Sequence, residues 1–242
     1  MELRNPGLRI LPPLSAIIGA RLSMNNTNIK NKAVKMAVST IGLLVGTASI
    51  IHGIFEVLQG NIMPDSLVTN AIGQHQKIWE YAALHIFTII PNMLATGIMT
   101  IIIGLFFTLW AAIFITKKNG AWLMFILSIL LFLVGGGSGP LFIGIIISII
   151  ATRIYKPLKL WQEKIPTPVT LFFSKMWPWI IYFYIFSYIF SVVFAITGIP
   201  FILILDLPTA YNVLLSMGYF LLFFMSLVIV SALSVDSKKI EA

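Results

Sequence analysis

His52 and Glu56 are the residues of this 242-residue sequence whose types and spacing best suit chemistry. They stand four positions apart, so in a helix they share one face. An imidazole and a carboxylate together can bind Zn²⁺ or another divalent cation, and they can also relay protons near neutral pH. Ionisable groups within apolar spans are costly and usually face a partner or a water-filled cavity. With His85, which we expect on the same side of the membrane, they form the candidate polar site.

Plain structural roles are open for the same residues. Near the end of a span both side chains can reach the interface by snorkelling, and a His–Glu pair can simply stabilise its helix. No HExxH or comparable ligand spacing occurs, so a metal site is only weakly indicated. The absence of cysteine excludes thiolate ligands and cysteine nucleophiles, and no P-loop or dinucleotide glycine motif indicates a cofactor.

The elements that must position these residues are apolar helices. Hydrophobic residues make up 59% of the chain and charged residues 10%, with a mean hydropathy of +0.98. Soluble domains carry about 25% charged residues, so the composition is that of a membrane protein. The net charge of +8 lies almost wholly between the apolar blocks, as orienting charges do. We therefore expect the lipid bilayer, and not nucleic acid, as the partner of this charge.

Long apolar blocks define the expected spans, since a helix needs about 20 apolar residues to cross the bilayer. One block should begin only after a break near Pro91, because proline removes a helix hydrogen bond. The stretch 121–152 is interrupted by Gly-Gly-Gly-Ser-Gly-Pro at 135–140, which predicts two short spans or a re-entrant hairpin. The uninterrupted blocks are 37–58, 93–115, 177–205 and 210–233.

The basic residues decide the topology. If the chain enters and returns within 121–152, every Lys and Arg except Lys77 falls on one side of the membrane, which is then the cytoplasmic side. The sequence therefore predicts an all-α, polytopic transmembrane helix bundle with both termini in the cytoplasm. It has six spans, or five plus a re-entrant hairpin at 121–152. A basic segment 1–36 and a tail 235–242 flank a single transmembrane domain, 37–234.

Small residues mark one face of the first span. Gly42 and Gly46 form a GxxxG motif, and Gly53 continues roughly the same face. Small residues let helices approach closely in lipid. We expect this face to pack on another span of the same chain, or on a second copy or a membrane partner.

Two segments carry a resemblance. His-Gly-Ile-Phe-Glu-Val-Leu-Gln-Gly-Asn at 52–61 and the glycine-rich segment 135–140 resemble a family of uncharacterised prokaryotic polytopic membrane proteins, over roughly 37–154. The resemblance implies an integral protein of a prokaryotic cell membrane and carries no activity with it.

Three functional classes fit these observations. A small-solute or ion binding or transport protein would use His52, Glu56 and His85 as its polar site. A membrane-embedded enzyme would use the same groups as metal ligands or as acid and base. An accessory subunit would have no site of its own. The first class is the one we favour.

Overall fold

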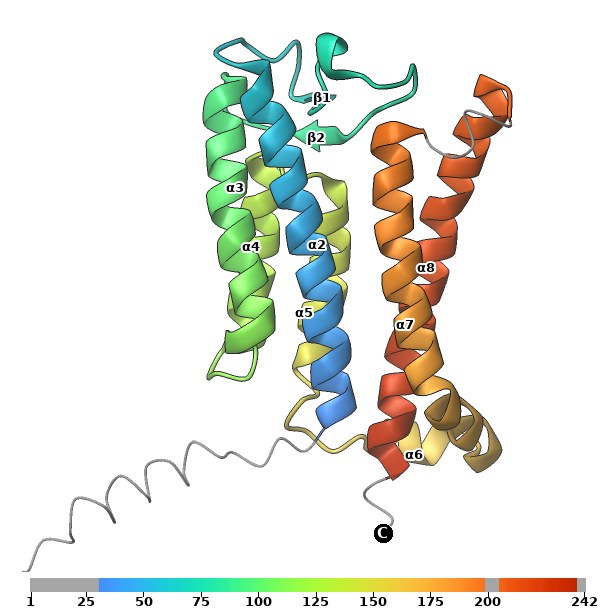
Figure 1. Ribbon diagram of the computed structural model, residues 1–242. Coiled ribbons are helices and arrows are strands. Elements are labelled where there is room, and N and C mark those ends of the chain that lie inside the picture. Colours follow the sequence, from blue (N-terminus) through green and yellow to red (C-terminus); the bar gives the residue numbers. More distant parts are fainter. Residues whose placement is uncertain (1–30, 199–204, 239–242) are drawn as a thin grey trace, which may run out of the picture.

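The computed structural model describes residues 31–198 and 205–238, and in these ranges the chain is an all-α bundle with one small sheet (Figure 1). This confirms the all-α prediction. A π-helical turn, η2 (Trp110–Phe114), continues α3, so the two form one helix of 22 residues. The helices are α2 (Lys32–Gln59), α3 (Met93–Leu109), α4 (Gly120–Leu133), α5 (Ser138–Ala151), α6 (Lys159–Lys164), α7 (Thr167–Thr197) and α8 (Leu207–Lys238).

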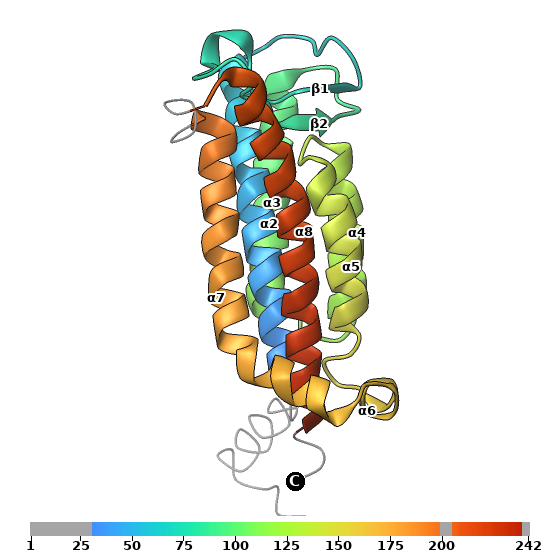
Figure 2. The same ribbon diagram turned by 90° about the vertical axis from the view of Figure 1, so that its right-hand side faces the viewer.

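Within the described ranges, α2, the α3–η2 helix, α7 and α8 are the four helices long and apolar enough to cross a membrane. These four are fewer than the predicted six spans, or five plus a re-entrant hairpin, so the predicted number of spans is not confirmed. The stretch 121–152 forms two shorter apolar helices, the α4–α5 pair. Figure 2 shows this pair beside α8, with α2 and α3 behind.

The first two helices pack almost backbone to backbone. A Cβ placed on Gly53 would lie 2.8 Å from the carbonyl oxygen of Gly97, and one on Gly97 would lie 2.6 Å from that of Gly53. The mutual fit of two glycines lets α2 and α3 approach closely along their outer halves. On the inner half, Gly42 and Gly46 pack against side chains instead, those of Ala111 in η2 and Thr108 in α3.

The helix α3 begins at Met93, as the sequence predicts. The Asn92 side chain supplies the reason, because its Oδ1 accepts a hydrogen bond from the Ala95 N–H at 2.9 Å and caps the helix. The Asn92 side chain also bonds the side chain of Asn61, which ties the start of α3 to the end of α2.

The helices α4 and α5 are antiparallel and joined by the glycine-rich turn 134–137. At 14 residues each they are about 21 Å long, short of the roughly 30 Å of a hydrocarbon core. Gly135 and Gly137 have φ angles of 112° and 84°, which favour glycine and make the tight reversal possible. Interruption of 121–152 at its glycines is therefore confirmed.

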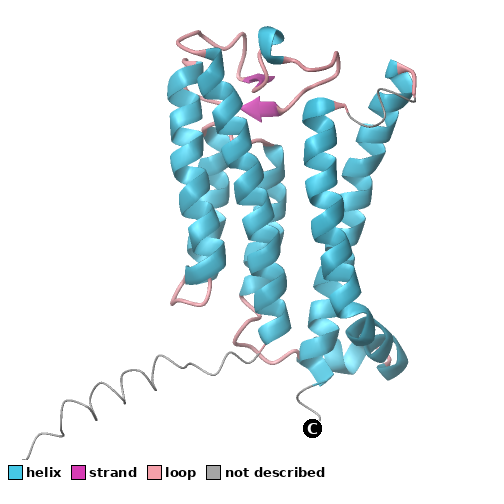
Figure 3. Ribbon diagram, in the orientation of Figure 1, coloured by secondary structure: helices cyan, strands magenta, loops and turns pink. Residues whose placement is uncertain are grey.

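A small subdomain covers the turn of this hairpin. The strands β1 (Val68–Asn70) and β2 (His85–Phe87) pair antiparallel, with a 3₁₀ turn η1 (Gln74–Gln76) between them (Figure 3). The Ile89 N–H then donates to the Leu133 carbonyl at 3.1 Å, and Thr88 forms a β-bridge with Val134. Backbone groups left open at the end of α4 are thus satisfied by the segment between α2 and α3.

The α7 boundaries differ from the predicted block 177–205. The helix starts ten residues earlier, at Thr167, with Pro168 in its first turn, where the missing N–H costs nothing. It ends at Thr197 because Gly198 has φ 70°, a left-handed cap. Residues 199–204, which complete the predicted block, lie outside the described ranges.

The opposite end of the bundle is tied by polar contacts. Asp236 of α8 accepts a hydrogen bond from the Val34 N–H at 2.8 Å and so caps α2. The Asn31 amide donates to the carbonyls of Arg153 and Lys156 at 2.5 and 2.8 Å. Residues 235–238 of the expected tail and 32–36 of the expected N-terminal segment are helical. Residues 1–30 and 239–242 lie outside the described ranges.

Candidate functional site

Glu56 is fully enclosed near the outer end of α2. Its side chain is 0% exposed, and neither carboxyl oxygen has a hydrogen-bond partner within the described ranges. A Cβ at Gly135 would lie 2.7 Å from Glu56 Oε1, so the carboxyl sits directly over the glycine-rich turn. The close approach requires glycine at this position, in addition to its positive φ.

A layer of buried hydroxyls surrounds this carboxyl. Thr96 and Thr100 of α3 are both 0% exposed, and the Thr100 hydroxyl lies beside Glu56. Thr100 donates its proton to the Val134 carbonyl at 2.5 Å. Thr96 pairs with the Thr88 hydroxyl at 3.1 Å. The carboxyl is therefore set among oxygen atoms, between α2, α3 and the glycine-rich turn.

His52 lies one helical turn before Glu56 and faces Gly137, the last glycine before α5. A Cβ at Gly137 would lie 2.8 Å from His52 Cε1. His52 Nδ1 is buried and has no hydrogen-bond partner in the part of the chain that the structure describes. Because Gly135 and Gly137 have no side chains, the turn fits against both polar groups of α2.

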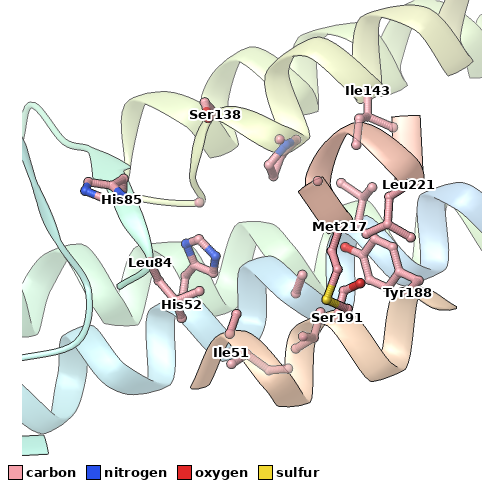
Figure 4. A pocket seen from close by; sticks show the side chains of 18 of the residues that line it. Ile51, His52, Leu84, His85, Ser138, Ile143, Tyr188, Ser191, Met217 and Leu221 are labelled. Carbon is pink, nitrogen blue, oxygen red and sulfur yellow. The ribbon is translucent and has the colours of Figure 1, made fainter. Parts of the chain in front are cut away.

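A cavity of about 270 Å³ opens beside His52. Its walls are mainly apolar and come from α2, the start of α5, α7 and α8. In Figure 4 the His52 ring stands at one end, and Tyr188, Ser191 and Met217 stand at the other. The other labelled lining residues are Ile51, Leu84, His85, Ser138, Ile143 and Leu221.

The three residues of the candidate polar site are placed differently. His52 and His85 line the same cavity, but His85 stands on β2 and is an exposed side chain. Glu56 is not among the residues that line the cavity and lies behind the glycine-rich turn. The described residues contain no group of three or more His, Asp or Glu side chains arranged to hold a metal ion.

Ser138 lines the same cavity as His52 and follows Gly137, the glycine that meets His52, at the start of α5. Ser138 is exposed, and Figure 4 shows it on the side of the turn away from the His52 ring. A serine nucleophile needs a base within hydrogen-bond reach. This serine and this histidine do not form such a pair.

The glycine face of α2 is occupied within the chain. Gly42 and Gly46 are buried against α3, η2 and α4, and Gly53 is buried against Gly97. A stripe of small residues that meets such neighbours is not free for a second molecule. The face holds Glu56 and His52 in place by fixing α2 against α3.

The hydroxyl layer and its fit to the glycine-rich turn were not found from the sequence. Threonine in an apolar helix gives no distinct signal, because it also bonds its own helix backbone, as Thr108 does to Gly104. The usable signal is the three consecutive glycines, which indicate that something packs against their backbone.

In length and hydropathy α2, α3–η2, α7 and α8 are compatible with the spans of a helical membrane protein. Comparison of the chain with protein-family models, with curated proteins and with solved structures gives no match. The site must therefore be interpreted from its own geometry.

Proposed function

We propose that this chain is a multi-pass integral membrane protein that binds a small, mostly apolar solute in the cavity beside His52, as a solute-binding or transport protein. The observation that carries the proposal is the cavity. Apolar side chains from four helices line it, while His52, Tyr188 and Ser191 add polar groups from two of them. Small-molecule sites are commonly concave and apolar, with a few placed polar groups that orient the ligand.

His52 selects the kind of solute. His52 lines the cavity, so its imidazole is the polar group that a ligand meets at that end. A neutral imidazole nitrogen can donate or accept one hydrogen bond. The solute is therefore a small amphiphile whose polar group meets His52 and whose apolar part lies between α7 and α8.

The proposed topology follows the charges and the helix directions. The start of α2, the α3–α4 and α5–α7 connections and the end of α8 lie at one end of the bundle (Figure 1) and carry basic residues. This end is proposed to be cytoplasmic, with both termini there. Six helices then enter the membrane, of which α4 and α5 are short and completed by the outer subdomain.

The setting and partners complete the proposal. The proposed partner of the apolar helices is the lipid bilayer, and the resemblance of 52–61 and 135–140 to prokaryotic membrane proteins is the reason to propose a prokaryotic cell membrane. A homo-oligomer or a membrane partner stays a prediction, and it would use a surface other than the Gly42 and Gly46 face, which is buried within the chain.

Binding can be tested by ligand-induced thermal stabilisation of the purified protein. The probes are hexanol, hexylamine and hexanoate, which share one alkyl chain and differ in the polar group. At about 100 times its Kd a ligand stabilises the folded state by about 2.7 kcal/mol, so one probe should raise Tm clearly above the others. Ala48→Phe fills the cavity from α2 and should abolish the increase.

Leu43→Phe is the matched control, because Leu43 stands on α2 with an exposed side chain outside the cavity. It should keep the ligand-induced increase in Tm. No stabilisation by any probe, or equal stabilisation of Ala48→Phe, would contradict solute binding in this cavity. His52→Ala should weaken binding about 10-fold, as expected for one lost hydrogen bond, whereas the exposed His75→Ala in η1 should not.

Single cysteines test the proposed topology in sealed vesicles, since the chain has no cysteine of its own. Gln74→Cys in η1 and Lys118→Cys in the α3–α4 connection are both exposed. A membrane-impermeant maleimide should label them from opposite sides, with Lys118→Cys on the cytoplasmic side. Labelling of both from the same side would refute the proposed topology.

A further inference from the structure

We propose that Glu56 is a proton-binding site enclosed between α2, α3 and the glycine-rich turn, and that it carries a proton in the folded protein at neutral pH. The site is distinct from the cavity beside His52, and it does not depend on whether a solute binds there.

The charges around Glu56 give the first argument. The segments Met93–Leu109, Gly120–Leu133 and Ser138–Ala151 contain no ionisable side chain. Lys32 and Lys35 stand at the opposite end of α2, and the outer segment carries Asp65, His75, Lys77 and Glu80. Nearest among the structure's elements are His52 on α2 and the exposed His85 on β2. The carboxyl oxygens of Glu56 have no hydrogen-bond partner within the described ranges. A carboxylate buried without a counter-charge in an apolar medium is strongly unfavourable, and protonation removes the charge.

The directions of the hydrogen bonds give the second argument. A hydroxyl has one proton, and the proton of Thr100 goes to the Val134 carbonyl at 2.5 Å. While its proton is on the Val134 carbonyl, Thr100 offers only lone pairs to the carboxyl beside it. In that arrangement protonated Glu56 can donate to the Thr100 oxygen, which gives the chain Glu56 to Thr100 to Val134. Turned toward Glu56, the same hydroxyl would instead donate to an ionised carboxylate, and the infrared measurement below distinguishes the two arrangements.

The other buried hydroxyls of this region bond to backbone carbonyls or to each other. Ser49 lies within reach of the carbonyls of Val45 and Gly136 at 3.1 and 3.2 Å. Thr96 reaches the Ile90 carbonyl at 3.4 Å and pairs with Thr88 at 3.1 Å. Within the described ranges none of these hydroxyls bonds to the Glu56 carboxyl, which suits a neutral carboxylic acid.

His52 stands between Glu56 and the cavity along the same face of α2. It lies one turn from Glu56, its Nδ1 is buried without a partner in the described ranges, and its ring lines the cavity. The carboxyl itself is not part of the cavity lining, so its proton is shielded from the cavity by the glycine-rich turn.

Infrared difference spectroscopy tests this proposal on the full chain in lipid nanodiscs. At pH about 7 exposed carboxyls are ionised and show no carboxylic-acid C=O band. Wild type should show one such band that shifts in D₂O and is lost in Glu56→Gln. Glu80→Gln, at an exposed glutamate of the outer segment, should keep the band. Its persistence in Glu56→Gln, or its absence from wild type, would overturn the proposal.

Two Thr100 variants separate a hydrogen-bonded acid from a merely buried one. Thr100→Val removes the acceptor, so the C=O band should move to higher frequency, and Thr100→Ser should restore it. An unchanged band in Thr100→Val would contradict the hydrogen-bond chain. If wild type instead shows only ionised carboxylate and is stabilised by NaCl or KCl relative to choline chloride, an alkali cation occupies the site and the proton proposal is wrong.

Discussion

The contact between α2 and α3 and the contact between α7 and α8 are built from opposite kinds of residue. Gly53 and Gly97 bring α2 and α3 together almost backbone to backbone. The helices α7 and α8 meet through aromatic rings, such as Phe183 and Phe224 with centroids 4.7 Å apart. Large side chains of this pair, including Trp179, also face outward and are exposed.

The difference explains where the polar groups lie. A glycine contact leaves room for small hydroxyls and a carboxyl between the helices, and it fixes their positions because the backbones themselves touch. An aromatic contact fills its own space and offers an apolar surface. Glu56 accordingly lies on the glycine side, and α7 and α8 supply much of the apolar wall of the cavity.

The largest expected effect is at the α2–α3 contact. In Gly53→Val the new Cβ would lie 2.8 Å from the Gly97 carbonyl oxygen. This atom belongs to the backbone of α3, which cannot move aside as a flexible side chain can. Overpacking of this kind costs about 3 kcal/mol or more. We expect loss of the monodisperse folded protein in detergent, measured by size-exclusion chromatography and thermal unfolding.

Gly218→Ala on α8 is the matched substitution in the other region. Nothing lies within 4 Å of a Cβ at Gly218. Alanine is a better helix former than glycine by about 1 kcal/mol, so Tm should stay equal or rise. Equal destabilisation by Gly53→Ala and Gly218→Ala would remove the distinction between the two contacts.

Trp79 joins the outer subdomain to α7, and its removal should have the next largest effect. Its ring stacks on Phe194 with centroids 5.7 Å apart, and its Nε1–H donates to the Ala195 carbonyl at 3.2 Å. Trp79→Ala should lower the unfolding free energy by about 3 kcal/mol. Trp79→Phe, which keeps most of the ring, should cost about 1 kcal/mol for the hydrogen bond. Chemical unfolding measured by circular dichroism gives both values. Equal losses of unfolding free energy in Trp79→Ala and Trp79→Phe would show that the ring stacking does not stabilise the protein.

The smallest effect is expected at Asp206, before α8. Hydrogen bonds from Thr209 lower the pKa of the Asp206 carboxyl. A lowered pKa in the folded state means that the contribution to stability is present above the ordinary pKa of about 3.9 and is lost as the pH falls through the folded value. Asp206→Asn has no charge to lose, so its Tm should be slightly below that of wild type at pH about 7, and the two Tm values should converge as the pH falls through the folded pKa. An identical pH profile for the two proteins would show that Asp206 does not contribute.

The sequence predicts much of the helical framework for simple reasons. Block length fixes α2, α3 and α8 to within a few residues, and the glycines at 135–137 predict the reversal between α4 and α5. The outer subdomain was not predicted, because its strands have three residues each and depend on side-chain contacts such as Asn70 Oδ1 with the Leu84 N–H at 2.8 Å. Such contacts leave no periodic pattern.

The site was predicted only as a set of residues. The spacing of His52 and Glu56 places both on one face of α2, and the structure has them there. The sequence pattern does not show which segment of the chain packs against that face. Gly135 meets Glu56 and Gly137 meets His52, so one glycine-rich turn divides the face into an enclosed carboxyl and a cavity wall. This division depends on the distance between α2 and α4–α5, which no local pattern reports.

The most direct measurement compares thiol accessibility at two positions of α7. Ser191 lines the cavity and Ser187, one turn away, does not, yet both are 8% exposed. With no native cysteine, Ser191→Cys and Ser187→Cys give clean signals with a water-soluble maleimide. The cavity predicts labelling of Ser191→Cys about 10-fold faster in the folded protein, since reaction follows access to the thiolate. Equal rates in the folded protein would contradict a solvent-accessible cavity beside His52.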